Sequence, residues 1–406
     1  MAADVVITGI GAVTPVGNDR ESTWSALLAG TSGVAPITSF DASPLPTRIA
    51  AEVKGFDPGA YLEGKRLRRS ARFTQLAVAA AREAVADAEL TLDPDRTGVV
   101  INAAVAGFDT IERATRTMDD DRRLGPYFVA SSLTNMPACE VAIDLGVHGP
   151  VTASALACAS GNYALLEARR LILSGEADVV VCGGTDAAIT PVMFAGLSSM
   201  GALSQRNDDP AAASRPFDAG RDGFVFGEGS VVMVLESREH AERRGAQTYA
   251  ALAGGALTAD AFHVSAPSPQ GEYAAAAITK ALRNAGIAPE QVDYVSAHGT
   301  STKANDRTET MAIRQAYGKA ADRLAVSSPK SMVGHLIGAA GALGAMTAVL
   351  AIRDGVVPPT INLTTPDPEC DLDYVPNVAR PLEVRTATAN AFGFGGQNCV
   401  AVFTTA

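Results

Sequence analysis

The stretch VTASALACASGNYALLEARRLILSGEADVVVC, residues 151–182, decides the fold class. It begins with a short β-branched run at 151–154 and passes through a tight Ala/Ser segment. An Ala- and Leu-rich stretch at 161–173 follows, and the apolar run 179–182 ends the segment. Continuously apolar short runs are typical of strands covered on both faces, whereas the longer Ala/Leu-rich stretch favours a helix. The segment therefore predicts a strand–helix–strand unit of an α/β protein with a buried sheet.

The same alternation extends over the whole chain. Further strands are predicted at short apolar runs, namely 5–10, 98–102, 231–235, 294–297, 324–327 and 399–403. Further helices are predicted at Ala-rich stretches, namely 70–88, 272–285, 306–317 and 335–351. No long linker interrupts the pattern, and we place a boundary between two halves, 1–250 and 251–406, near residue 250.

Composition excludes several classes of protein. The 406 residues are 47% apolar and 19% charged, which is incompatible with general disorder. A net charge of −11 argues against a nucleic-acid partner, because such binding needs basic surface. The run 336–352 is apolar or small except for Thr347, but it is short for a membrane span and dense in Gly and Ala, so it predicts a buried helix and no membrane association.

The cysteines and the N-terminus indicate a reducing compartment. The five cysteines are odd in number and form no CxxC pair, so neither a disulfide framework nor a zinc site is predicted. No close pair of histidines occurs, and we expect no catalytic metal. The first ten residues carry an acid where a signal peptide has basic residues, so we expect a cytoplasmic protein.

One cysteine stands apart from the others. Cys158 lies between the strand at 151–154 and the helix that starts near Gly161, at a helix N-terminus that would favour the nucleophilic thiolate. Its alternative is a buried structural cysteine. Cys139, Cys182 and Cys399 lie inside apolar runs and are predicted to be core residues.

Two histidines occupy Gly-rich positions at the ends of elements. His298, in AHGTST, directly follows a predicted strand, and His335, in KSMVGHLIGAAG, begins the predicted helix 335–351. A lone histidine is more often a hydrogen-bonded core residue, but two at such junctions beside Cys158 suggest thiolate chemistry with imidazole donors. In the tail NAFGFGGQN, the glycines around Phe394 would let backbone N–H groups approach a ligand, although an ordinary turn between two strands is the alternative.

Together these motifs resemble the elongating, Cys-His-His type of β-ketoacyl-acyl carrier protein synthase. The resemblance runs from VVITGIGAVTPVG through ALACASG, GALSQRNDDPAAASRPFDAGRDGFVFGEG, DAFHVSAPSP, AHGTST and KSMVGHLIGAAG to NAFGFGGQN. It implies the thiolase fold, a five-layered αβαβα architecture of two similar halves. It also implies transfer of an acyl chain to Cys158, followed by decarboxylative condensation with a malonyl thioester, in fatty-acid or polyketide synthesis.

The resemblance also implies partners and residue roles. The substrates would be carried on the phosphopantetheine of an acyl carrier protein, with no other cofactor. The enzyme would be a homodimer or a heterodimer with a homologous chain-length-factor-like subunit. His298, His335 and Lys330 would join Cys158 in catalysis, and Phe394 would be a gate whose N–H joins that of Cys158 in an oxyanion hole. The substrate-binding positions would be Thr300, Thr302, Phe392, Phe394 and Val105.

This sequence departs from the family pattern at several positions. The fatty-acid members usually carry a Glu that pairs with the lysine, but Gly344 stands at that position, which leaves the partner of Lys330 open. Lys303 replaces a common Pro, and Val105 stands where the wall of the acyl pocket is expected. These changes suggest a secondary-metabolite ketosynthase.

Two other functions remain open at this stage. A thiolase would share the fold and the nucleophile, but it needs a second cysteine as base, and Cys399 lies within a predicted strand. A non-catalytic chain-length-factor-like subunit would lack the nucleophile, and Cys158 argues against it.

A basic segment, GKRLRRSARF, stands out from the acidic chain. Like charges at helical spacing are mildly destabilising, so the cluster suggests a docking site for an acidic carrier protein rather than a contribution to folding. A solvated helix face is the alternative, and Arg72 could face inward. The residues predicted to dock the carrier are Lys65, Arg66, Arg68 and Arg69, with Arg206 nearby.

Overall fold

The computed structural model describes residues 5–120 and 122–406, and its main feature is one large sheet. The ten strands of this sheet are, in spatial order, β10 (Ala325–Ser327), β9 (Tyr294–Ser296), β13 (Thr386–Gly393), β14 (Gln397–Thr404), β8 (Ala250–Ala259), β1 (Val5–Val13), β7 (Gly229–Ser237), β6 (Val179–Asp186), β4 (Thr97–Asn102) and β5 (Val151–Thr152).

The sheet consists of two halves with the same strand pattern. In the first half, β5, β4 and β6 are parallel, and β7 and then β1 continue the sheet in antiparallel fashion. In the second half, β10, β9 and β13 are parallel, and β14 and then β8 follow in the same way. The halves meet where β1 pairs with β8 over two residue pairs, Val6 with Ala251 and Ile7 with Ala250. This repeat supports the division near residue 250, which stays a prediction.

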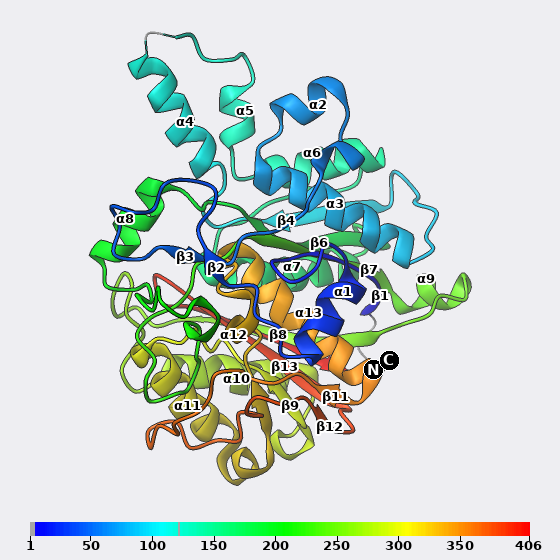
Figure 1. Ribbon diagram of the computed structural model, residues 1–406. Coiled ribbons are helices and arrows are strands. Elements are labelled where there is room, and N and C mark those ends of the chain that lie inside the picture. Colours follow the sequence, from blue (N-terminus) through cyan, green and yellow to red (C-terminus); the bar gives the residue numbers. More distant parts are fainter. Residues whose placement is uncertain (1–4, 121) are drawn as a thin grey trace.

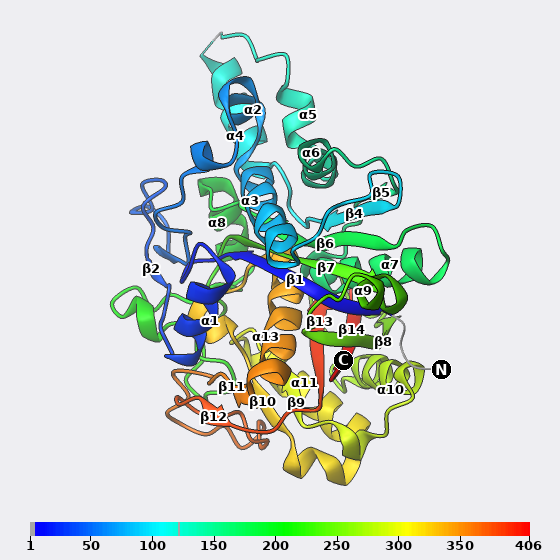
Figure 2. The ribbon, with the colours of Figure 1, turned by 90° about the vertical axis from the view of Figure 1, so that its right-hand side faces the viewer.

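Helices form three further layers around the two halves of the sheet (Figure 1). Helices α3 (Arg72–Asp87) and α6 (Met136–Leu145) cover the first half, whereas α10 (Glu272–Ala285) and α11 (Lys303–Tyr317) cover the second. Between the halves lie α7 (Ser160–Leu173) and α13 (Ala340–Asp354), as the view in Figure 2 also shows. This arrangement confirms the expected five-layered αβαβα architecture.

The remaining elements are short and lie around this core. They are α1 (Arg20–Leu28), α2 (Gly64–Arg69), α4 (Phe108–Asp119), α5 (Phe128–Ser132), α8 (Pro191–Ser199), α9 (Arg238–Arg243), α12 (Lys330–Val333), and the strands β2 (Ala35–Pro36), β3 (Ile49–Ala50), β11 (Val356–Val357) and β12 (Arg380–Pro381).

The apolar helix at the centre is buried, as expected from its composition. The stretch Ile337–Asp354 is long and apolar enough to cross a membrane, but 89% of it is buried inside the protein. It packs against β13 and α7, and its small residues allow the backbones of the two central helices to approach closely. The described residues include no second helix of that length and hydropathy.

The structure differs from the sequence-based prediction at several elements. Strands β8 and β13 were not predicted, because their many Ala, Gly and Thr residues carry little of the usual strand signal. The predicted helix 335–351 begins only at Ala340, because Ile337 adopts a left-handed conformation with φ +52°. Cys139, predicted to be a core residue, is only partly buried on α6.

Candidate active site

Cys158 lies in a single 3₁₀ turn, Ala157–Ala159, that leads directly into α7. Ala157 has φ +46°, a conformation that costs energy for a residue with a side chain and that tightens this turn. Gly393 packs against the turn so closely that a Cβ on it would lie 2.7 Å from the carbonyl oxygen of Leu156. Only glycine fits there, and the end of β13 can therefore approach the backbone of Cys158.

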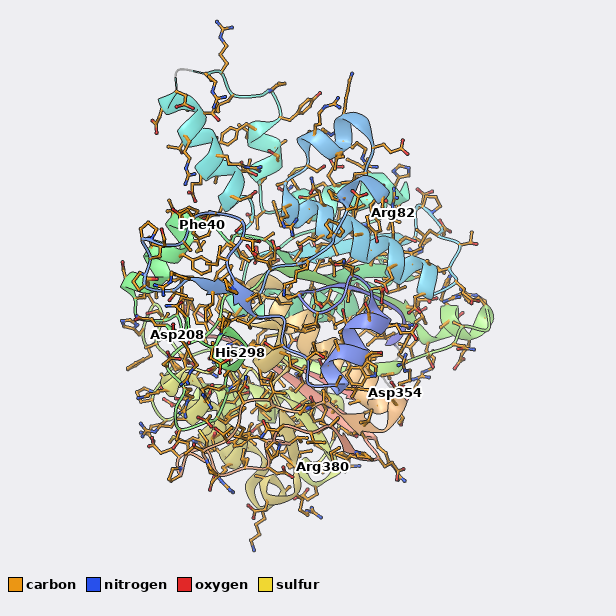
Figure 3. The ribbon with its side chains drawn as sticks, in the orientation of Figure 1. Phe40, Arg82, Asp208, His298, Asp354 and Arg380 are labelled. Atoms are coloured by element: carbon orange, nitrogen blue, oxygen red, sulfur yellow. The ribbon has the colours of Figure 1, made fainter. Side chains whose placement is uncertain are left out.

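Both predicted histidines point toward this cysteine. His298 follows β9, and His335 follows α12 and is hydrogen-bonded through its backbone to Val225. Their rings are 5.5 Å apart and nearly perpendicular, at 83°. The sulfur of Cys158 and a ring nitrogen of each histidine lie within 4.8 Å of one another. Figure 3 shows His298 in the interior, between the layers.

The hydrogen bonds of His335 define its tautomer. The backbone N–H of Ile337 donates to Nδ1 of His335 at 3.1 Å, so Nδ1 is unprotonated and the proton of the neutral ring is on Nε2. Burial lowers the pKa of both imidazoles well below 6.5, and the positive charge of Lys330 lowers it further. Both rings are therefore neutral at physiological pH and can act as hydrogen-bond donors without carrying a charge.

The thiol of Cys158 is less acidic than its position before a helix suggested. Burial raises its pKa to about 11, although the charge of Lys330 and the backbone N–H of Phe394 act in the opposite direction. The expected stabilisation of the thiolate is therefore outweighed by the loss of water around the sulfur. Acyl transfer to this thiol requires a group that takes up its proton, and the neutral imidazole of His298 is suited to that task, because Nε2 of His335 already carries a proton.

Lys330 is buried at the first position of α12 and contacts the backbone of His298. Its Nζ donates to the carbonyl oxygen of His298 at 2.5 Å. Burial lowers its pKa to about 8, and the negative charge of Glu309 is the largest opposing influence. Glu309 thus supplies the negative charge near Lys330. The sequence analysis had left the partner of Lys330 open, because Gly344 stands where the family usually has a Glu.

Glu309 is a site residue that the sequence analysis missed. Its carboxylate on α11 accepts the backbone N–H groups of His298 at 2.8 Å and Gly299 at 2.7 Å, and the side-chain amide of Asn390 at 3.1 Å. It therefore fixes the chain where His298 leaves the strand. Its signal in the sequence was an acid pair, Asp306 and Glu309, on one helical face just after HGTST.

The predicted substrate-binding residues lie on several sides of the cluster. The hydroxyls of Thr300 and Thr302 are hydrogen-bonded to each other at 2.9 Å. The ring of Phe392 lies 5.7 Å from that of His298. Val105 packs against an apolar cluster that contains Ile337 and Phe226.

Phe394 lies in the tight turn between β13 and β14, and 41% of its surface is exposed. The next residue, Gly395, has φ +83° and donates its N–H to the carbonyl oxygen of Val264 at 2.8 Å. Phe394 is thus a large side chain on a turn that is hydrogen-bonded to a second loop. The backbone N–H of Phe394 is directed at Cys158.

The basic residues separate into two groups. Arg66 pairs with Asp144 at 2.7 Å and with Glu140, to which Arg69 also lies close, at 3.5 Å. Arg72 faces inward and pairs with the buried Glu228 at 2.7 Å. Within residues 5–120 and 122–406, Lys65 and Arg68 are exposed on α2 and form no ion pair.

Arg206 does not lie beside α2, contrary to expectation. Its guanidinium donates to the carbonyl oxygen of Gly220 at 3.2 Å. Figure 3 places the neighbouring Asp208 well away from α2, which Figure 1 shows at the far end of the molecule in the same orientation. Within one chain, the two basic sites are therefore separate.

The donor set at the cluster also has the chemistry of a metal site. One thiol and two imidazoles are the ligands that Zn²⁺ prefers. A bound ion would be coordinated by the sulfur of Cys158, and this sulfur could then not accept an acyl group.

The comparisons with known proteins agree with this geometry. Residues 2–241 match the family described as "Beta-ketoacyl synthase, N-terminal domain", and residues 249–364 match "Beta-ketoacyl synthase, C-terminal domain". The chain belongs to the β-ketoacyl synthase family. It is therefore an acyltransferase that catalyses decarboxylating condensation with substrates on an acyl carrier protein.

Curated relatives of this synthase cover nearly its whole length. The chain is 48% identical over 404 residues to a 3-oxoacyl-[acyl-carrier-protein] synthase 2 of Synechocystis sp., covering 98% of this chain and 97% of the relative. It is 47% identical over 399 residues to a protein of the same name from Coxiella burnetii, covering 97% and 96%.

Solved structures show the same fold. A structure titled the ishigamide ketosynthase/chain length factor matches with a TM-score of 0.94 at 37% identity, covering 100% of both chains. A type II PKS ketosynthase in complex with its acyl-carrier protein matches with a TM-score of 0.92 at 34% identity, again covering 100% of both. The synthase thus has the thiolase fold. Cys399 lies in the ladder between β14 and β8, fully buried, which fits a synthase and not a thiolase with a second active-site cysteine.

Proposed function

We propose that Cys158 accepts the acyl chain and that His298 and His335 act on the malonyl thioester. The observation that carries this assignment is the convergence of one buried thiol and two neutral imidazoles within 4.8 Å. In the first step, the sulfur attacks the acyl thioester of the carrier. The carrier thiol leaves with the proton that Cys158 loses, and acyl-Cys158 is formed.

In the second step, the malonyl thioester loses CO₂ and becomes an enolate. Two neutral donors are suited to this step, because they stabilise the developing oxyanion and cannot protonate the carbanion as an imidazolium would. The enolate carbon attacks the carbonyl of acyl-Cys158, and the new carbon–carbon bond displaces the sulfur. The product is a β-ketoacyl chain that is two carbons longer and remains on the carrier.

The acyl chain itself would lie along the apolar cluster beside His335. This cluster contains Ile337, Phe194 and Phe226, with Val105 packed against it, and a chain with many carbonyl groups would lose hydrogen bonds to water on such apolar side chains. We infer that the preferred chain is a reduced, fatty-acyl one, and this proposal replaces the secondary-metabolite role that the departures from the family pattern suggested. Comparing acylation of Cys158 by alkanoyl and poly-β-ketoacyl thioesters, by intact-protein mass spectrometry, tests this preference.

Phe394 would act as a gate between the two steps. The turn that carries it is flanked by Gly393 and Gly395, so the backbone can change conformation at low steric cost. Its attachment to Val264 through Gly395 means that two loops would move together.

We expect Phe394→Ala to impair the order of acyl loading and malonyl entry. With the ring absent, malonyl thioester can reach the site before Cys158 is acylated, so unproductive decarboxylation should increase relative to condensation. Rapid-quench measurements of single-turnover acylation, CO₂ release and extension give this ratio. An unchanged ratio would refute gating.

Carrier docking would use the two exposed cations of α2, Lys65 and Arg68. They are not committed to ion pairs within the described residues, unlike Arg66, and so remain available to an acidic carrier. Arg206 would belong to a second contact, since it does not lie beside α2.

We expect Lys65→Glu and Arg68→Glu to lower kcat/KM for carrier-bound substrates, by about tenfold for a charge reversal that costs about 1.4 kcal/mol of encounter energy. The deficit should decrease as salt rises, because salt screens exposed charges. Small thioester substrates without the carrier should react as with the unmodified enzyme. As a matched control, Arg66→Gln should change stability, through the loss of its pairs with Glu140 and Asp144, more than carrier affinity.

The enzyme would also pair with a second thiolase-fold subunit. Strand β5 is one of the two edges of the sheet, and large exposed apolar side chains gather on or directly after the neighbouring helices α4–α6, namely Ile111, Met118, Val129, Leu133 and Ile143. Such a surface beside an unpaired edge favours a protein interface. A dimer mass for the purified chain would identify a second copy as the partner, whereas a monomer that dimerises only when mixed with a homologous subunit would identify that subunit. We place this reaction in the cytoplasm, with no cofactor beyond the phosphopantetheine of the carrier.

A further inference from the structure

Asp186 is a fully buried carboxylate at the end of β6, and all its recorded partners are backbone N–H groups. Its Oδ2 accepts from Ala104 at 2.9 Å and from Gly338 at 2.7 Å, and its Oδ1 accepts from Ala106 at 3.0 Å and Val105 at 3.2 Å. Within the described residues, it takes part in no ion pair. A buried charge held only by peptide N–H groups is costly unless the position needs it.

The four donors come from two segments that meet at the active site. One segment, 104–106, contains Val105, and Ala106 is left-handed with φ +50°. The other runs from His335 to Gly338, and Ile337 is left-handed with φ +52°. Neither is a glycine, so each conformation costs about 1–3 kcal/mol and must be held by its surroundings. The carboxylate of Asp186 accepts the N–H of Ala106 itself and of the residue after Ile337.

The backbone at Gly338 packs so tightly that no larger residue fits at this position. A Cβ on Gly338 would lie 2.4 Å from Oδ2 of Asp186 and 2.8 Å from the backbone nitrogen of Ala104. The backbone of Gly338 is therefore in direct contact with both the carboxylate and the opposite segment.

Two consecutive peptide units connect Asp186 to the ring of His335. The N–H of Ile337 donates to Nδ1 of His335, and the next N–H along the chain, that of Gly338, donates to Asp186. The position of Gly338 on the carboxylate thus helps fix the N–H that sets the tautomer of His335. The side chain of Ile337 projects into the apolar cluster against which Val105 packs.

We propose that Asp186 is a positioning residue that, through one carboxylate, sets the orientation of the His335 imidazole and the distance between the Val105 and Ile337 walls, and so determines acyl-chain selectivity. This inference rests on the proposed roles of Cys158 and His335. It goes beyond these roles because it assigns the acyl-chain selectivity to a residue that contacts neither the Cys158 thiol nor the bound acyl chain.

An electrostatic signature accompanies the positioning role. The negative charge of Asp186 contributes to the raised pKa of the Cys158 thiol, after burial, which is the main cause. Burial raises the pKa of Asp186 itself to about 6, although its four N–H partners oppose this, so the group is charged at neutral pH. Removing this charge should make the Cys158 thiol more acidic.

The test uses Asp186→Asn in the full-length enzyme. The amide has the same shape, but its NH₂ group cannot accept the N–H groups that one oxygen now accepts, so one of the two segments loses its anchor. We expect the ratio of kcat/KM between long and short acyl substrates to change by about tenfold, the lower end of the discrimination that one methylene gives in an apolar pocket. Alkylation of Cys158 by iodoacetamide should shift to lower pH.

Two further variants separate positioning from stability and from charge. Gly338→Ala keeps the charge but displaces its segment, so it should change the selectivity ratio and leave the alkylation profile nearly unchanged. Glu236→Gln removes a buried carboxylate that contacts Thr8, His240 and Arg244, and should lower the melting temperature without changing either readout.

The outcomes distinguish the inference from the function on which it rests. If wild-type Cys158 is not acylated, the proposed function fails, whatever Asp186 does. If wild-type Cys158 is acylated, but Asp186→Asn and Gly338→Ala only lower the melting temperature and keep the wild-type selectivity ratio, the role of Asp186 is structural and the inference is wrong. If Asp186→Asn does not fold, the selectivity of Gly338→Ala decides.

Discussion

Cys158→Ala is expected to abolish condensation, because no other cysteine lies in the cluster with the two histidines. The loss should reach the background of the assay, since without a covalent acyl intermediate the enolate has no acceptor. Malonyl decarboxylation, which we propose depends on the two histidines, should persist. The measurement is product formation from acyl- and malonyl-carrier substrates, with CO₂ release followed in parallel. Undiminished product would contradict the assignment of Cys158.

Cys158→Gln should separate the two half-reactions further. The glutamine amide resembles an acylated cysteine, so the site would be in its malonyl-accepting state, and decarboxylation should stay at or above the wild-type rate. Cys139→Ser is the matched control, because Cys139 is a partly buried cysteine on α6 outside the cluster. It should leave both half-reactions unchanged. Mass mapping of iodoacetamide-labelled peptides verifies which cysteine is modified.

His298→Ala and His335→Ala are expected to block the second half-reaction and spare the first. Each variant removes one neutral donor from the developing enolate, and loss of one positioned donor costs about 10²–10³-fold in rate. Condensation and decarboxylation should fall by that factor, while acyl-Cys158 still accumulates, as seen by intact mass. Acylation passes through no enolate and should slow less, and His335→Ala should slow it least, because neither ring nitrogen of His335 is free to take up the thiol proton.

The control for this pair is His148→Ala, since His148 is an exposed histidine that does not belong to the cluster. It should behave as the wild type in both steps. A histidine variant that condensed at a near wild-type rate would return that histidine to a structural role. A variant that also lost acylation completely would mean that the histidine activates Cys158. The proposal that the histidines act mainly on the malonyl thioester would then be wrong.

The sequence alone predicted the class of fold and the members of the cluster. Short apolar runs alternate with Ala-rich stretches, and this local pattern reports burial and periodicity directly. Cys158, His298 and His335 each stand where a predicted strand or helix meets a Gly-rich segment, so their motifs could be recognised without knowing what lies opposite. The strands β8 and β13 escaped prediction because tertiary packing, not intrinsic preference, makes their Ala- and Gly-rich segments extended.

The chemical state of the cluster depended on the tertiary structure. The position of Cys158 before a helix predicted a thiolate, but burial by distant segments raises the pKa of its thiol to about 11. The compensation of Lys330 by Glu309 and the anchoring of two segments by Asp186 join residues that are far apart in the chain. The local sequence motifs therefore identified which side chains form the site of this synthase. Desolvation and long-range hydrogen bonds, which depend on the complete three-dimensional packing, decided their protonation and orientation.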